Sequence, residues 1–392
     1  MFTAIEEFIK KESTSGILLI FVTLLALFLQ NSFLTDFYTN FLYTPVHITF
    51  GDFGIAKPFL LWVNDGLMAI FFFLVGLEVK REVLEGELSS KEQIVLPLIA
   101  ALGGMIVPAL IFILFNQGND EAMKGWAIPT ATDIAFALGI LSLLGNRVPV
   151  SLKIFLMALA IIDDLGAIVI IAFFYTSALS LTSILIAMSA LSGLVLLNRL
   201  GVVKKAAYVL LGVILWLSVL KSGVHATIAG VLFAFTIPLY STSKSGERFS
   251  MLKEMEHDLH YWVAFFILPL FAFVNAGVDL KDLQPSALLS NVSLGIMLGL
   301  FLGKQLGVFG FSYIAIKLKL AILPKGSTFK ELYGVSILTG IGFTMSLFVD
   351  TLAYNDSDIF YFTDKLAILL GSFLSGIVGY LVLRKLSKTI VE

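Results

Sequence analysis

The sequence contains no cysteine and few charged residues. Without cysteine there is no disulfide framework, no thiolate zinc site and no thiol redox centre. Only 14% of the 392 residues are charged, against roughly 25% in ordinary soluble domains. The formal net charge of −2 gives no bulk field that attracts polyanions. These shortages exclude a soluble enzyme, a nucleic-acid-binding protein and a disordered scaffold.

Apolar residues are abundant in this chain. They make up 58% of it, the mean hydropathy is +0.96, and there are 35 Phe and 32 Gly. A helix needs about 20 apolar residues to cross a bilayer. The apolar runs predict an all-α, polytopic membrane protein that forms one integral membrane domain over residues 1–392. The twelve predicted helices lie at about 13–35, 59–85, 93–117, 121–144, 150–175, 179–198, 205–220, 222–241, 257–277, 285–311, 330–350 and 360–384.

The distribution of basic residues supports an even number of helices. With both termini in the cytoplasm, Lys304 falls inside a span and most of the other Lys and Arg residues fall on the inner side. The lysines left on the outer side are Lys57, Lys124, Lys221, Lys281 and Lys365. Such an excess of inner positive charge is typical of inner-membrane topology. Residues 1–12 favour a short surface helix over a frayed tail, and residues 35–58 are either a β-hairpin or a plain loop.

Charged residues inside the predicted spans are candidates for function because a charge at mid-membrane is costly. Asp163 and Asp164 are adjacent, so on a helix their side chains point about 100° apart and face different neighbours. One acid can line a cavity while the other pairs with a basic residue, for which Lys304 is the obvious candidate. Asp65 lies early in the second predicted span. His225 stands alone in the sequence and is either a packing residue or a gate.

Two of the predicted spans carry residues that interrupt helices. The fourth contains Pro129, Thr130, Thr132 and Gly139, and the eleventh contains Gly340 and Gly342 between threonines. A lone Gly-x-Gly also fits close helix packing. Each interrupted span is the middle one of a three-helix group, and paired interruptions of this kind mark transporter sites at the membrane midplane. If the two breaks cross, Asp133 would neutralise facing N-termini and Lys304 facing C-termini.

Six motifs in order resemble the NhaA sodium/proton antiporters of bacterial inner membranes. They are residues 64–69 (NDGLMA), 75–82 (VGLEVKRE), 131–139 (ATDIAFALG), 160–166 (AIIDDLG), 221–227 (KSGVHAT) and 340–346 (GIGFTMS). The resemblance covers nearly the whole chain. It implies twelve helices in inverted repeats, two of them broken. It also implies electrogenic exchange of Na⁺ or Li⁺ for a larger number of protons, with activation at alkaline pH and a role in sodium and pH homeostasis.

The resemblance also assigns roles to residues. It implies that Asp163, Asp164 and Thr132 form the ion and proton site, with Asp163 and Asp164 holding Na⁺. It implies that Asp133 and Lys304 compensate helix dipoles and couple protons. The implied pH-sensing residues on the cytoplasmic side are Glu78, Arg81, Glu82, Lys253, Glu256, His257 and His260. Glu254 departs from the family pattern, which is basic there, and this puts the set point of the pH response in doubt. The 35–58 segment resembles the family's dimer contact, so a homodimer is expected; no cofactor and no nucleic-acid partner are expected.

The chemistry of the residues agrees with the resemblance. Hard cations prefer oxygen ligands, which the two carboxylates, the Thr132 hydroxyl and freed backbone carbonyls supply. A carboxylate oxygen holds a proton or Na⁺ but not both, so competition gives antiport when the site faces one side at a time. A proton-coupled symporter of organic solutes would need a roomier site with polar or aromatic recognition groups. An intramembrane aspartyl protease would need two acids from different helices, whereas these two adjoin on one.

Overall fold

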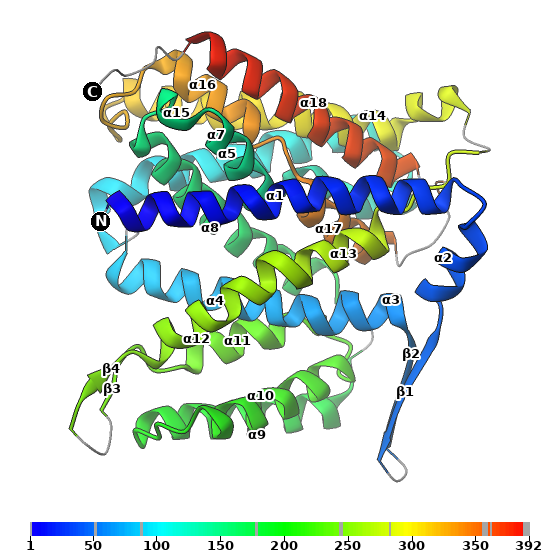
Figure 1. Cartoon of the computed structure of the whole chain (residues 1–392), viewed down its shortest axis with the longest axis vertical. Coiled ribbons are helices and arrows are strands. Elements are labelled where there is room, and N and C mark those ends of the chain that lie inside the picture. The colour runs from blue at the N-terminus through cyan, green and yellow to red at the C-terminus, as the bar shows by residue number, and fades with distance from the viewer. Residues whose placement is uncertain are drawn as a thin grey trace. The chain divides into compact units, whose positions relative to one another are not determined.

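The computed structural model describes residues 2–50, 53–86, 89–176, 179–242, 246–281, 284–354, 360 and 363–386. Most of these residues are helical, and the strands among them form two short antiparallel hairpins (Figure 1). Among them, seven helices are long and apolar enough to cross a membrane, or up to ten if each of three bent pairs is one span. Helices satisfy their own backbone hydrogen bonds, which a lipid environment requires. The structure confirms the all-α, polytopic membrane class.

The chain divides into two compact units. Unit 1 comprises residues 1–35, 87–167 and 275–392, and unit 2 comprises residues 36–86 and 168–274. The α-helices mainly in unit 1 are α1 Phe2–Gln30, α5 Lys91–Asn116, α6 Asp120–Met123, α7 Ile134–Leu143, α8 Val150–Phe174, α14 Asn291–Leu298, α15 Gly310–Lys317, α16 Phe329–Leu338, α17 Phe343–Tyr354 and α18 Thr363–Leu386. Its 3₁₀ segments are η3 Lys124–Thr130, η4 Gly145–Arg147 and η6 Pro285–Leu289, and its π segments are η7 Gly299–Gly303 and η8 Gln305–Phe309.

Unit 2 contains the remaining helices and both hairpins. Its α-helices are α2 Thr35–Leu42, α3 Phe59–Trp62, α4 Met68–Glu85, α9 Leu181–Arg199, α10 Lys205–Leu220, α11 Ile228–Thr236, α12 Met251–Trp262 and α13 Leu268–Asn275. Its π segments are η1 Val63–Leu67 and η5 Val263–Ile267, and its strands are β1 Pro45–Phe50, β2 Phe53–Pro58, β3 Ser241–Thr242 and β4 Arg248–Phe249. Each π segment joins its flanking α-helices into one continuous rod, such as Phe59–Glu85.

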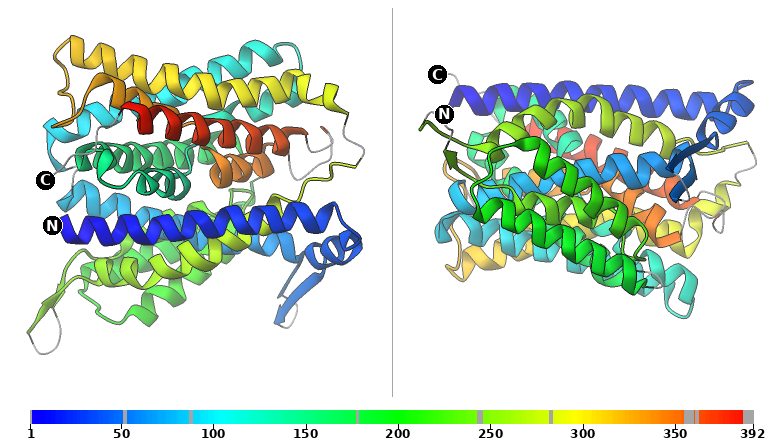
Figure 2. Two further views of the ribbon diagram at one scale, coloured as in Figure 1. Left: turned by 45° about the horizontal axis from the view of Figure 1, so that its top comes forward. Right: turned by 90° about the horizontal axis from the view of Figure 1, so that it is seen from below.

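Two spans of unit 1 are broken in the middle, as predicted for the fourth and eleventh helices. The first break lies between η3 and α7 and bends the span by 41°, and the second lies between α16 and α17 and bends it by 46°. α18 packs along both α14 and α16, which is visible in Figure 2 as the red helix beside yellow and orange ones. The broken elements therefore lie among long, unbroken helices of the same unit.

In unit 2, residues 45–50 and 53–58 form the strands of a β-hairpin, so the later part of the 35–58 segment is a hairpin and not a plain loop, while residues 35–42 form the helix α2. β1 and β2 pair antiparallel, with Ile48 opposite Ile55. α9 and α10 lie side by side in both figures (Figures 1 and 2). A buried cluster around Leu194, Tyr208 and Phe233 joins these two helices to α11.

Several helix bounds differ from the predicted ones. α1 begins at Phe2, so the predicted surface helix and the first span are one helix, because no glycine or proline precedes Gly16. α11 begins only at Ile228 because a turn with Gly223 at φ +88° follows α10. α12 begins at Met251, where Ser250 accepts a hydrogen bond from the Lys253 N–H. Because Lys253 and Glu254 lie in this first turn, hydropathy alone does not indicate that the helix has already begun. Residues 361–362 of the last predicted helix lie outside the described residues.

Candidate ion-binding site

Asp163 and Asp164 lie in the middle of α8, and both are buried. Asp163 is 2% exposed and Asp164 is 5% exposed. The Lys304 ammonium donates to Asp163 Oδ2 over 2.8 Å. Asp163 Oδ1 is also buried and has no hydrogen-bond partner among the residues that the structure describes. One oxygen of this carboxylate is therefore held by a cation, while the other keeps its capacity to accept a proton or to coordinate an ion.

Lys304 is placed by tight packing between two long spans of unit 1. It lies between the π segments η7 and η8 and is fully buried. A Cβ on Gly307 would come within 2.1 Å of the Gly103 carbonyl oxygen, and one on Gly103 within 2.3 Å of the Gly307 oxygen. Only glycine permits α5 and η8 to approach so closely. Lys304 is near enough to both Asp163 and Asp164 to interact with them electrostatically.

The two helix breaks cross and bind one another directly. The Asp133 N–H donates to the Ile341 carbonyl over 2.6 Å, and the Thr132 hydroxyl donates to the Thr339 carbonyl over 3.1 Å. The Lys304 ammonium in turn donates to the Thr132 hydroxyl over 2.8 Å. A hydroxyl has one hydrogen and two lone pairs, so Thr132 keeps one lone pair for a further partner. Lys304 is thus linked through Thr132 to the C-terminal end of α16.

Asp133 caps two helix N-termini at the same time. Its Oδ1 accepts from the Phe136 N–H of α7 over 3.0 Å. Its Oδ2 accepts from the Thr344 N–H of α17 over 3.1 Å and also from the Thr344 hydroxyl. Both helix ends carry partial positive charge, which one buried carboxylate compensates. The sequence showed Thr344 only within a motif, and its place at the start of a half-helix, where it donates to Asp133, was not evident from spacing.

The arrangement gathers oxygen ligands in unit 1. The buried Lys304 ammonium binds one of two adjacent carboxylates and a threonine hydroxyl, and that hydroxyl binds a carbonyl of the second break. Oxygen atoms of this kind suit hard monovalent cations, and carboxylates also take protons. Unwound backbone at membrane depth is tolerated where it lines a cavity or is buried in protein. Here Thr339, Ile341 and Thr132 are all buried.

Part of the predicted pH-sensing set lies together in unit 2. Arg81 contacts Glu82 at 2.6 Å and Glu256 at 2.9 Å, joining α4 to α12. His260 Nδ1 lies 3.9 Å from Glu78 Oε1. These five residues therefore form one cluster of charged and titratable side chains across two helices.

The other two members of the predicted set make no ion pair with this cluster among the described residues. The Lys253 ammonium pairs with Glu85 at 2.7 Å, and the His257 side chain is 85% exposed. Glu254, the departure from the family pattern, pairs instead with Lys205 at 3.1 Å on α10. The acidic residue at this position therefore has a local partner in unit 2.

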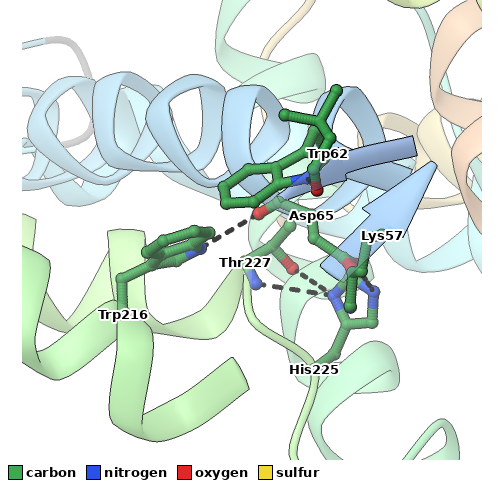
Figure 3. A network of polar contacts seen from close by, with 7 residues as sticks. Lys57, Trp62, Asp65, Trp216, His225 and Thr227 are labelled. Atoms are coloured by element: carbon green, nitrogen blue, oxygen red, sulfur yellow. Dashed lines mark hydrogen bonds and ion pairs between the residues drawn. The ribbon is translucent and has the colours of Figure 1, made fainter. Parts of the chain in front are cut away.

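Asp65 and His225 belong to a separate polar network in unit 2 (Figure 3). The Lys57 ammonium lies 2.6 Å from Asp65 Oδ2, and His225 Nε2 lies 3.6 Å from Asp65 Oδ1. The Trp216 ring N–H donates to the Asp65 backbone carbonyl over 3.1 Å. Asp65 is thus paired at the end of the β1–β2 hairpin, and His225, which stands alone in the sequence, is not isolated in the fold.

Crossed broken helices beside buried acids, within an all-α membrane protein, define a membrane ion carrier. Residues 6–383 match the family model described as Na⁺/H⁺ antiporter 1, and the chain belongs to this family. It is 70% identical to the Na⁺/H⁺ antiporter NhaA of Sulfurovum sp. (strain NBC37-1), with 99% of both chains covered. It is 64% identical to the Na⁺/H⁺ antiporter NhaA of a Nitratiruptor species, covering 96% of this chain and 97% of the relative. The NhaA of Campylobacter concisus (strain 13826) is 61% identical, with 97% and 92% covered.

Proposed function

We propose that this protein is an electrogenic antiporter that extrudes Na⁺ or Li⁺ in exchange for a larger number of protons. It resides in the bacterial inner membrane with both termini in the cytoplasm, and it serves sodium and pH homeostasis. The observation that carries the proposal is the buried Asp163–Asp164 pair, one oxygen of which has no partner among the described residues. The naming of relatives at up to 70% identity as Na⁺/H⁺ antiporters supports the same reaction.

In this proposal, the acids, Lys304 and the broken helices work together. Na⁺ binds the deprotonated carboxylates with help from the Thr132 hydroxyl and the freed carbonyls. Protons bind the same oxygens, so the two ions exclude each other. Two carboxylates and Lys304 offer more titratable sites than one monovalent cation fills, which supports electrogenic exchange. Asp133 and the crossed breaks hold the two half-helix pairs together while the site opens to one side at a time.

The same competition makes transport rise toward alkaline pH. At acid pH the carboxylates hold protons, and a protonated site does not bind Na⁺. The unit 2 cluster of Glu78, Arg81, Glu82, Glu256 and His260 adjusts the midpoint through its local field. We also propose a homodimer. The β1–β2 hairpin and the preceding helix α2 carry exposed apolar side chains, with Ile48 57% exposed and Phe37 65% exposed. These residues suit a contact with a second copy of the chain.

The test is Asp164→Asn in purified protein reconstituted into liposomes with a pH-sensitive dye. An amide neither takes a proton nor balances a cation's charge, so exchange on adding Na⁺ or Li⁺ should be abolished while the protein inserts normally. Asp120→Asn is the matched control, because Asp120 is exposed in the first turn of α6 and should leave exchange unchanged. Flux through Asp164→Asn comparable to that of the unmodified protein would refute the site. K⁺ serves as the ion-selectivity control.

A further inference from the structure

One buried acid of unit 1 takes no part in the site described above. Asp350 lies in α17, the second half of the eleventh span, and is 1% exposed. The flanking residues Phe348 and Val349 are apolar and buried as well. An acid at such a position is expensive to keep in a membrane helix, and carboxylates there commonly serve ion or proton pathways.

Asp350 lies on a face of α17 that packs against the other broken span. Ser346, Asp350 and Tyr354 are spaced by four residues and therefore share one helix face. The Ser346 hydroxyl donates to the Ile128 carbonyl over 2.8 Å, and the Tyr354 hydroxyl donates to the Ala122 carbonyl over 3.0 Å. Between these two contacts, Asp350 lies at the level of the middle of η3.

The same helix connects Asp350 to the crossing of the breaks. Asp350 follows Thr344, which binds Asp133, by six residues, or about 9 Å along the helix axis at 1.5 Å per residue. From Thr344, α17 runs toward the end of the span that the predicted topology places outside. The carboxylate of Asp350 therefore lies in the half of unit 1 between the crossing and the outer surface.

η3 and α18 both pack against α17, and charged residues lie on these two elements and on α6, which leads into η3. Lys124 at the start of η3 pairs with Glu121 at 2.7 Å, and both side chains are about half exposed. At the first turn of α18, Asp364 is 3% exposed and Lys365 follows it. Two buried acids, Asp350 and Asp364, thus belong to consecutive helices at the predicted outer end.

We propose that Asp350 is a relay residue for cations and protons in the outer half of the transport route. This inference rests on the proposed antiport function. Na⁺ that leaves the central acids is held briefly by the Asp350 carboxylate before it reaches the outside. A proton arriving from outside replaces it on the same carboxylate and then passes inward.

The experiment compares the two faces of the protein. Right-side-out and everted membrane vesicles present Na⁺ to the outer and the inner face, respectively. For Asp350→Asn, the apparent KM for Na⁺ at the outer face should rise on the order of ten-fold, because one unit charge is lost about 9 Å from the crossing. The KM at the inner face should stay unchanged, and the dependence on outer pH should shift. Asp350→Glu keeps the carboxylate and should restore the outer KM.

Ser346→Ala and Tyr354→Phe are the matched controls, because each removes a hydrogen bond from the same helix face without removing charge. They should lower thermal stability without any difference between faces. Equal changes at both faces in Asp350→Asn, or no change, would overturn the proposal. If Asp350→Asn does not fold, Asp350→Ser decides by the same comparison: an apparent KM for Na⁺ raised only at the outer face supports the relay, and equal changes at both faces or no change overturn it. If the unmodified protein shows no exchange of Na⁺ for protons, the proposed function itself is refuted.

Discussion

Replacing Lys304 with alanine should destabilise the protein strongly. The ammonium is fully buried and binds Asp163 and Thr132, each at 2.8 Å. Its loss leaves a carboxylate that is 2% exposed without its cation. Removing one partner of a buried ion pair costs about 3–5 kcal/mol. At about 2–4 °C per kcal/mol for a domain of 150–250 residues, the melting temperature should fall on the order of 10 °C. The assay is thermal melting in detergent, followed by size-exclusion chromatography.

Three further variants identify the cause of that loss. Lys330→Ala removes an exposed lysine from α16 of the same unit and should melt like the unmodified protein. Lys304→Arg keeps the charge and should retain part of the stability. Combining Lys304→Ala with Asp163→Asn removes the uncompensated carboxylate, so the double variant should melt above Lys304→Ala alone. If Lys304→Ala melts like Lys330→Ala, the ammonium reaches the surface and the buried pair is wrong.

Three more predictions concern transport and the crossing. A potassium diffusion potential set with valinomycin should change the initial rate of Na⁺ movement at equal pH on both sides, and an unchanged rate would contradict electrogenic exchange. Apparent Na⁺ affinity should improve as pH rises. His260→Ala should shift the pH at which exchange is half-maximal, because His260 contacts Glu78, whereas replacing the exposed His257 with alanine should leave that pH unchanged. Asp133→Ala should destabilise by about 1–2 kcal/mol for each helix end it uncaps, measured as a lower melting temperature, and a melt equal to that of the unmodified protein would argue against the shared cap.

The sequence predicted those features that have local signals. Asp163 and Asp164 stand out because they interrupt an apolar run, and the two breaks stand out because Pro, Gly and Thr gather there. The membrane class follows directly from composition. For residues 35–58 the sequence allows a hairpin or a plain loop, because alternating apolar residues occur in loops as well as strands; neither interpretation predicts the helix α2 in the first part of this segment.

Other features depend on packing that no single segment encodes. Which of two adjacent acids meets Lys304 depends on how α8 is rotated against η7 and η8, and the structure selects Asp163. Asp350 carries no local signal in the sequence, because it directly follows an apolar run and so looks like the first polar residue outside a span. His257 and His260 look equivalent three residues apart, yet one is exposed and the other contacts Glu78, because only one side of α12 faces α4.

The contacts of Lys304 join ion binding to the broken helices. From Asp163, a chain of hydrogen bonds runs through Lys304 and the Thr132 hydroxyl to the Thr339 carbonyl at the end of α16. In the proposed function, a cation that binds the acids competes with the ammonium for the Asp163 carboxylate, since both carry positive charge. Displacing Lys304 from Asp163 therefore also disturbs its hold on Thr132. Because Thr132 is bound to the opposite break, we propose that occupancy of the acids changes the contact between the two broken spans, which is the coupling that alternating exposure of one site requires.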